Sequence, residues 1–436
     1  MAWDCACGAR AQTGSFCPYC GRRNLDVPLP PLPAADHWAP APRRGLTAAG
    51  KVLAVVIGAL LLAGGAVVER RVPDRVARSE RPAPPAAGRV AVEAAVKRGK
   101  AFVEEYRGKK FLHDVDVDLL DEAAFVRELV GEEDDDPGED EDNFNATLRG
   151  LGLADPGEDV DDTEEELVTS SVVGFYDDEA ERLVVRGGTL TPYSEMVLVH
   201  ELTHAWQDQH FDLGTLYADL DTQDEALALR ALVEGDAVRT ETAWRERQPR
   251  AVRTEIDKVE EADAGEDGGA GDGEPTKAQL ALGALYGFPY QVGEDFVGDL
   301  FDHGGNAEVD AAFAEPPVCT AQVLHPDRYR ARDLPDDPAD PRAEGSVVDR
   351  GSLGEAGFVV LLAAGEPDDD ALDVAEGWDG DEYVTWLDRG HPCTTVSVVM
   401  TDAGERDELH AALRDRGVRG LTKVGRRALT FVSCSA

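Results

Sequence analysis

The longest apolar stretch of the chain lies near its N-terminus. Residues 52–68 read VLAVVIGALLLAGGAVV and contain no charged side chain. Together with the apolar residues from Leu46 onward, the stretch is long enough to cover the hydrocarbon core of a bilayer. Arginines flank it on both sides, and the preceding segment is too long to be the n-region of a cleaved signal peptide. We therefore predict a transmembrane helix over residues 46–68 rather than a buried helix of a globular core.

Downstream of this stretch, helical and strand-like patterns follow one another. A hairpin pattern covers residues 168–186, with a polar turn in its middle. Thr191 and Pro192 then form a typical N-cap and first helical residue, and helical spacing continues to about residue 209. Thr222 and Glu225 form a capping-box pattern that opens a long helix. Further helices are expected at 90–108, 118–130 and 405–413, and further strands at 383–386, 394–400 and 428–433.

Charge is distributed unevenly over the chain. The formal net charge is −44, yet residues 1–90 hold 12 basic and 6 acidic side chains. The acidic remainder argues against a nucleic-acid partner, because a phosphate backbone requires Lys and Arg for its neutralisation. Two explanations for the acidity stay open. One is adaptation to high salt, where screening removes self-repulsion. The other is a GC-rich genome combined with a few acidic loops.

Four of the seven cysteines lie in the first 20 residues, as Cys5 and Cys7, then Cys17 and Cys20, and each pair is followed by glycine. Paired thiolates on tight turns suit a tetrahedral structural zinc site. The segment resembles the zinc ribbons at the N-termini of many prokaryotic membrane proteins, although only one residue separates the first pair. The alternative is two disulfides. We predict a zinc ribbon over residues 1–27, whose partner the sequence does not identify.

The expected orientation in the membrane follows from this chemistry. Zinc-bound thiolates require a reducing compartment, which places the N-terminus in the cytosol and the large domain outside the cell. The count of basic residues on the two sides favours the opposite orientation, but that rule is weak for a long following domain. Outside the cell, Cys393 and Cys434 lie at the ends of two expected strands and could pair, which leaves Cys319 over.

The strongest chemical signal is the segment His200-Glu201-Leu202-Thr203-His204. Residues four apart lie on the same face of a helix, so both imidazoles can reach one ion. Neutral imidazole is a good ligand of Zn²⁺. Glu201 lies about 100° around the helix from His200, where a carboxylate can act on a zinc-activated water without binding the metal. The alternative is that the two histidines pair with carboxylates on an exposed helix.

A zinc site of this kind requires a third protein ligand, and two residues are candidates. Glu234 lies on an apolar face of the second long helix, where a buried acid needs a partner such as a metal. Gly235 beside it indicates close approach of another element. The alternative for Glu234 is an ion pair with Arg230 or Arg239. His210 completes a metzincin-like spacing, but Gln207 stands where that pattern has glycine, so we favour Glu234.

Three runs of sequence resemble the gluzincin type of zinc metallopeptidase, and more narrowly uncharacterised prokaryotic membrane-anchored HExxH proteins. They are VVGFYDDEAERLVVRGG, VLVHELTHAWQDQHFDL and ALRALVEGDAV. The resemblance covers residues 165–330. It implies a small sheet over an active-site helix, with His200, His204 and Glu234 as zinc ligands and Glu201 as general base. Asp236 could orient a ligand histidine, although its spacing from Glu234 differs from the family pattern.

Peptide hydrolysis also requires a donor that stabilises the oxyanion. His325 is our first candidate, and Tyr290 and Tyr329 are the alternatives. All three lie in a downstream block that shares the resemblance.

The predicted fold class is α+β, with a ribbon, one transmembrane helix and a zincin-like domain that continues into a C-terminal α/β portion. The segments are the ribbon at 1–27, a Pro-rich linker at 28–45, the span at 46–68, a stalk at 69–90, the metallopeptidase domain at 91–345, with acidic loops near 131–142 and 263–274, and the C-terminal portion at 346–436.

The predicted function is that of a membrane-anchored zinc metallopeptidase acting on proteins or peptides, with one catalytic and one structural Zn²⁺. The alternative is a catalytically silent surface protein that uses the same domain for binding.

Overall fold

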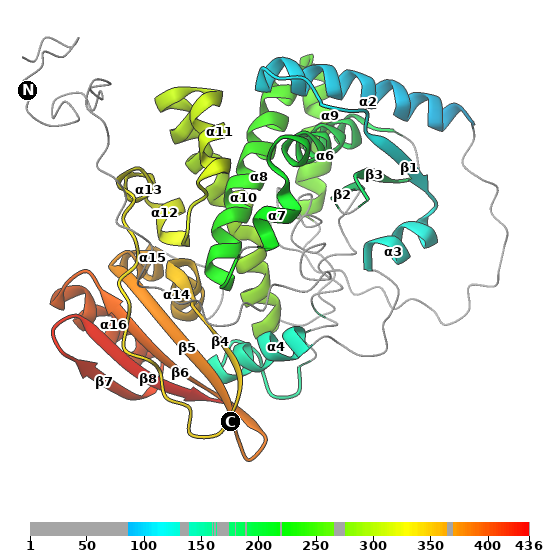
Figure 1. Ribbon diagram of the computed structural model, residues 1–436. Helices are drawn as coiled ribbons and strands as arrows, with labels where there is room; N and C mark the ends of the chain where they lie inside the picture. Colours follow the sequence, from blue (N-terminus) through cyan, green and yellow to red (C-terminus); the bar gives the residue numbers. More distant parts are fainter. Residues whose placement is uncertain are drawn as a thin grey trace, which may run out of the picture. The chain divides into compact units, whose positions relative to one another are not determined.

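A computed structural model describes most of the chain from residue 86 onward (Figure 1). The described residues are 86–130, 139–158, 160, 163, 174–178, 180–187, 190–218, 220–265, 275–363 and 369–435. All of them belong to one compact unit that spans residues 45–436. The predicted zinc ribbon with Cys5, Cys7, Cys17 and Cys20 lies outside the described residues, as do the Pro-rich linker and most of the stalk.

The predicted membrane anchor requires a correction. Within the described ranges, no helix combines the length and the apolar composition that crossing a bilayer requires. Even the 28-residue helix α10 (Lys277–Gly304) is interrupted by charged side chains, among them Glu294 and Asp299. Residues 46–68 themselves lie outside the described part of the chain. We therefore withdraw the single-pass membrane prediction, together with the cytosolic N-terminus and the external catalytic domain that depended on it.

The first part of the described chain is mainly helical and carries a small sheet. Its helices are α2 (Ala86–Arg107), α3 (Glu122–Val130), α4 (Glu139–Leu151), α6 (Pro192–Phe211), α7 (Leu213–Ala218), α8 (Gln223–Glu246), α9 (Arg250–Gly265), α10, α11 (Asn306–Ala314), α12 (Thr320–Leu324) and α13 (Pro326–Ala331). Its strands are β1 (Asp116–Leu120), β2 (Gly174–Asp177) and β3 (Arg182–Arg186). The expected hairpin is thus present in its described residues, as β2 and β3.

The three strands form a sheet in the order β1-β3-β2, in which β1 is parallel and β2 antiparallel to β3. Neighbouring residues of β3 point to opposite faces. Leu183 and Val185 join the core that α2 and α6 form, whereas Val184 packs with Phe125 of α3. Strands β1 and β2 are the two edge strands, and β2 contacts α6. The expected helix at 118–130 was wrong in its first residues, because 116–120 pair with β3 before α3 begins.

The C-terminal part contains the second sheet. Helices α14 (Gly354–Ala363), α15 (Asp369–Ala375) and α16 (Ala403–Asp415) pack with strands β4 (Ser346–Gly351), β5 (Trp378–Asp388), β6 (His391–Met400), β7 (Arg419–Val424) and β8 (Ala428–Cys434). The sheet order is β4-β5-β6-β8-β7, and every pairing is antiparallel. It is the orange and red sheet in Figure 1. Cys393 and Cys434 face each other in register and form a disulfide, which confirms that pairing, and Cys319 is a buried free thiol.

Helix α4 connects the two parts of the described chain. It lies between β1 and β2 of the small sheet in sequence, yet Leu148 and Leu151 belong to the same hydrophobic cluster as Val396 and Val398 of β6. Its first residues come from the acidic segment that we expected to form a loop. The C-terminal sheet therefore does not form its core from residues 346–436 alone.

Candidate metal centre

Helix α6 holds the two motif histidines. Thr191 caps the helix by accepting a hydrogen bond from the Ser194 backbone N–H at 3.1 Å, and Pro192 occupies the first turn, as predicted. The rings of His200 and His204 project from successive turns of one face, with centroids 4.7 Å apart. Both side chains are almost completely buried. The interior position excludes the alternative of an exposed histidine pair.

Helix α8 brings Glu234 to the two imidazoles. The helix opens with the predicted capping box, in which Thr222 and Glu225 bond each other's backbone N–H groups. The Oε2 atom of Glu234 lies 3.1 Å from His200 Nε2 and 3.3 Å from His204 Nε2. One ligand atom from each of the three residues lies within 4.8 Å of the other two. The structure therefore brings the three predicted ligands together.

This donor set fits a divalent metal. The Nε2 atom of His204 and the Oε1 atom of Glu234 are buried and have no hydrogen-bond partner in the described part of the chain. Orphaned polar atoms in a protein interior are rare and call for an explanation. Two imidazole nitrogens and one carboxylate oxygen are typical ligands of a catalytic zinc, which keeps a further position open. Burial alone would raise the pKa of Glu234, but the neighbouring histidines lower it to about 2, so the group is a carboxylate at neutral pH.

A second layer of side chains orients both histidines. His200 Nδ1 lies 3.1 Å from Glu241 Oε2, and His204 Nδ1 lies 2.9 Å from Gln207 Oε1. When each Nδ1 carries the proton and donates it to these acceptors, each Nε2 presents its lone pair to the cluster. Glu241 was not predicted, although it lies seven residues after Glu234. That spacing of two helical turns is the signal that could have found it.

Asp236 acts through Gln207 rather than on a histidine directly. The Gln207 amide donates to Asp236 Oδ2 at 3.0 Å and to the Val233 carbonyl at 2.9 Å, which fixes its oxygen toward His204. The fully buried Asp236 is balanced by Arg107 at 3.1 Å and by Arg239 at 3.3 Å. Arg239 therefore pairs with Asp236 and not with Glu234.

Glu201 lies beside the three ligands but points to the small sheet. Its Oε2 accepts a hydrogen bond from the Tyr176 backbone N–H of edge strand β2, at 3.0 Å. Burial raises the pKa of Glu201 to about 7, although the charges of His204 and His200 act in the opposite direction. A carboxyl group with this pKa can both accept and return a proton near neutral pH.

The three candidates for the oxyanion donor lie in different surroundings. His325 Nε2 is 2.8 Å from Glu355 of α14, and the Tyr329 hydroxyl donates to the Glu315 carbonyl at 2.9 Å. The ring of Tyr290 of α10 instead lies tilted beside His200, with ring centroids 6.4 Å apart. Its buried hydroxyl has no hydrogen-bond partner of good geometry among the described residues. Burial and the charge of Glu234 raise its pKa well above the usual range, so the hydroxyl keeps its proton.

His210 lies on α6 but outside the cluster of ligand atoms. Its Nε2 is 3.0 Å from the Lys110 carbonyl, and its ring packs on Trp206 at a centroid distance of 4.3 Å. Among the described residues, the group able to hold a metal consists of His200, His204 and Glu234. The geometry thus favours Glu234 over His210.

Close contact between α8 and α10 sets the position of Glu234. A Cβ atom on Gly235 would lie 2.1 Å from the Gly293 carbonyl oxygen, and one on Gly293 would lie 2.3 Å from the Ala231 carbonyl oxygen. Only glycine permits this approach of two helix backbones. The close approach predicted from Gly235 is therefore confirmed, and it places Tyr290 of α10 next to Glu234.

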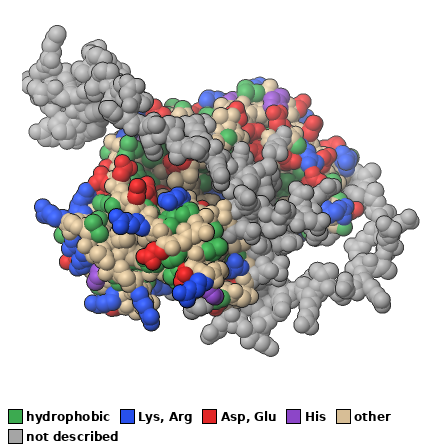
Figure 2. Space-filling model, turned by 60° about the horizontal axis from the view of Figure 1, so that its bottom comes forward, with side chains coloured by type: hydrophobic (Ala, Val, Ile, Leu, Met, Phe, Trp, Pro, Cys, Tyr) green, Lys and Arg blue, Asp and Glu red, His purple; other side chains and the backbone are tan. Residues whose placement is uncertain are grey.

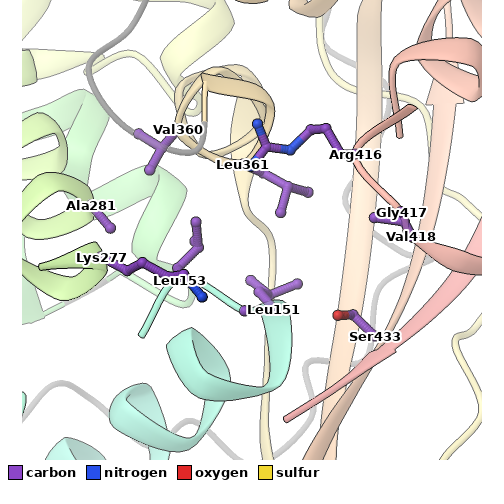
Figure 3. A pocket seen from close by; sticks show the side chains of 11 residues that line it. Leu151, Leu153, Lys277, Ala281, Val360, Leu361, Arg416, Gly417, Val418 and Ser433 are labelled. Carbon is purple, nitrogen blue, oxygen red and sulfur yellow. The ribbon is translucent and has the colours of Figure 1, made fainter. Parts of the chain in front are cut away.

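A cavity of about 310 Å³ lies elsewhere, between α4, α10, α14 and the end of the C-terminal sheet (Figure 3). Apolar side chains such as Leu153 and Leu361 line it, together with Lys277 and Arg416. None of the predicted site residues lines this cavity.

Comparison with protein-family models, with curated proteins and with solved structures found no match for this chain.

Proposed function

We propose that the protein is a zinc-dependent peptidase in which His200, His204 and Glu234 hold the metal and Glu201 is the general base. One observation carries the proposal. Three buried donor atoms from two helices converge beside a carboxyl group whose pKa is about 7. The resemblance of the surrounding sequence to gluzincins supports the same reaction, which is hydrolysis of a peptide bond.

A bound zinc ion would supply Lewis acidity for the activation of water and the polarisation of the peptide carbonyl. Side chains of the protein would transfer the protons and orient the ligands. Glu201, held by the Tyr176 N–H, takes a proton from the attacking water and returns it to the leaving amine. Glu241 and Gln207 keep the imidazoles in the tautomer that a metal requires.

We assign the oxyanion role to Tyr290 in place of His325. Its protonated hydroxyl is unpaired and buried beside the ligands, so it is available to donate to the developing negative charge. His325 already pairs with Glu355 of α14, and it directly follows α12, which packs against α14.

A catalytically silent binding protein is the competing function. Such a protein would retain the metal for its fold but would not need a base at position 201. The buried Glu201 with a raised pKa favours the enzyme, because an unused buried carboxyl group only destabilises the interior.

The test compares the full chain with three variants. The N-terminal cysteines are a second predicted zinc site, so the zinc content per chain of each variant is compared with that of the wild type. Glu234→Ala is expected to lose one equivalent, whereas His210→Ala is expected to lose none. Glu201→Gln is expected to keep its zinc and to lose peptide hydrolysis by about 100-fold or more.

Glu195→Gln is the matched control, since Glu195 lies on the same helix, pairs with Arg98 near the surface and should leave hydrolysis unchanged. Equal zinc in wild type and Glu234→Ala would refute the metal centre. A zinc-loaded wild type that hydrolyses no member of a peptide library would favour the binding function.

A further inference from the structure

Arg230 is a largely buried cation that has no anionic partner among the described residues. It lies on α8, one turn before Glu234, and only 9% of its surface is exposed. Its one contact of note is with the ring of Tyr286, 5.8 Å from the guanidinium carbon. No hydrogen bond or ion pair joins it to any residue that the structure describes. Buried arginines are normally paired.

The contrast with other buried arginines makes Arg230 exceptional. Arg107 and Arg239 both pair with Asp236, and Arg107 also pairs with Asp310. The chain has 87 acidic residues, so anionic partners are abundant. Glu234 lies four residues later on the same helix face, but its carboxylate contacts His200 and His204 instead. Among the described residues, no carboxylate therefore pairs with Arg230, which lies one helical turn from Glu234.

Two tyrosines show that this charge faces the site. The hydroxyls of Tyr217 and Tyr290 are both buried, and neither has a hydrogen-bond partner among the residues that the structure describes. Burial and the charge of Glu234 raise the pKa of each, and the charge of Arg230 lowers the pKa of each. Both hydroxyls therefore lie within electrostatic reach of Glu234 and of Arg230.

Arg230 is also less buried than the residues of the proposed metal centre. The exposed fraction is 2% or less for His200, His204, Glu201 and Glu234, but it is 6% for Tyr290 and 9% for Arg230. Arg230 lies one helical turn before Glu234 on α8, and Tyr286, whose ring it contacts, lies one turn before Tyr290 on α10. Arg230 and Tyr286 therefore form the neighbouring turn on both helices that carry Glu234 and Tyr290.

We propose that Arg230 is a carboxylate-binding subsite of this centre and that the preferred substrates are peptides with an anionic group next to the bond that is cleaved. The inference rests on the proposed peptidase function. A guanidinium group presents a planar pair of N–H donors that matches a carboxylate, and such charge-assisted bonds strengthen where water is excluded. The unpaired hydroxyl of Tyr217 provides a further donor.

The carboxylate has two possible sources, the free C-terminus of a peptide or an acidic side chain. A set of matched peptides distinguishes them on the full-length wild type. One member has a free C-terminus, one has a C-terminal amide, and a second pair carries Glu or Gln beside the scissile bond. We expect the anionic member of one pair to have a kcat/KM about tenfold or more above its neutral counterpart.

Substitution of Arg230 then links the preference to this residue. Arg230→Gln is expected to raise KM for the preferred anionic peptide by roughly 10- to 100-fold and to leave the neutral peptide unchanged. Arg230→Lys should retain part of the preference, because it keeps the charge but loses the planar fork. Arg389→Gln, at an exposed position, is the matched control.

The outcomes separate this inference from the proposed function. If zinc is bound and all four peptides are hydrolysed equally well, the subsite is refuted and the peptidase function stands. If nothing is hydrolysed, calorimetric binding of the same peptides to the Glu201→Gln protein decides, and equal affinity for anionic and neutral members refutes the subsite. A preference that survives unchanged in Arg230→Gln refutes it as well.

Discussion

At the scale of single residues, substitution of Glu241 tests whether the side chains that bind the Nδ1 atoms of the two histidines matter for the proposed metal site. Its carboxylate faces His200 Nδ1 at 3.1 Å, and it is nearly fully buried. Replacement by Ala removes the acceptor that fixes this ring. We expect the zinc affinity of the site formed by His200, His204 and Glu234 to fall by about 10- to 100-fold in Glu241→Ala. Competition with a chelator of known affinity measures the change.

Glu246→Gln is the control for this substitution, because Glu246 lies on the same helix and is exposed. A second comparison separates orientation from folding. Glu241→Gln keeps an oxygen acceptor of similar shape, so its zinc affinity should lie between that of wild type and of the Ala variant. Unchanged affinity in Glu241→Ala would show that His200 needs no such partner.

How far individual site residues can be predicted depends on how local their signal is. Spacing within one helix marked His200, Glu201 and His204, whereas Glu234 was marked by its apolar surroundings and by the resemblance to gluzincins. Glu241 follows Glu234 by two helical turns, but its contact with His200, like that of Gln207 with Asp236, depends on how α6 and α8 pack against each other. The sequence suggested Arg230 only as an alternative partner for Glu234. Its proposed role depends on the lack of a carboxylate partner among the described residues, which no sequence pattern reveals.

At the scale of elements, the crossing of α8 and α10 gives a sharp prediction. Gly235→Ala places a Cβ atom 2.1 Å from the Gly293 carbonyl oxygen, so the two helices must separate. We expect a loss of about 1–3 kcal/mol in the free energy of unfolding, even though Ala favours a helix. Zinc affinity should fall as well, because Glu234 moves with its neighbour. Chemical denaturation and chelator competition measure the two effects.

Gly298→Ala on α10 is the matched control. Nothing lies within 4 Å of a Cβ atom built there, so the same exchange should stabilise the protein by up to about 1 kcal/mol. If Gly235→Ala also stabilises, the close approach does not constrain the fold.

Helices could be predicted where a capping residue in the sequence marks their first turn. The caps at Thr191 and Thr222 are local, and both helices begin where these residues place them. The segment 116–120 has few strand residues of its own and becomes β1 by pairing with β3, more than 60 residues later. Helix α4 likewise gains its place from a sheet formed by residues far along the chain.

At the scale of the whole molecule, two long-range expectations had opposite outcomes. The pairing of Cys393 with Cys434 is confirmed, because strand ends in register bring the two residues together. The membrane anchor is withdrawn, because it was inferred from apolar length in a segment outside the described residues. The excess of acidic over basic residues concerns the entire surface, and the salt dependence of the melting temperature tests whether it is an adaptation to high salt.

The net charge of −44 predicts that salt stabilises the fold. Figure 2 shows acidic and basic side chains on the face that it draws, and the sequence holds 87 acidic against 43 basic residues, so an excess of negative charge remains. The screening length falls from about 10 Å at 0.1 M to about 3 Å at 1 M salt, which weakens the repulsion between like charges. We expect the melting temperature at pH 8 to rise by about 5 °C or more between 0.1 and 2 M KCl. Calorimetry or circular dichroism measures it.

The pH of the measurement provides the control that distinguishes screening from a general salt effect. The sequence has an isoelectric point near 4.4, so the net charge largely vanishes at pH 4.5. Excluded salts stabilise proteins at any charge, whereas screening acts only where repulsion exists. The rise in melting temperature should therefore be clearly smaller at pH 4.5 than at pH 8. An equal rise at both values would assign the effect to salt exclusion, and the acidic surface would then need no adaptation to high salt to explain it.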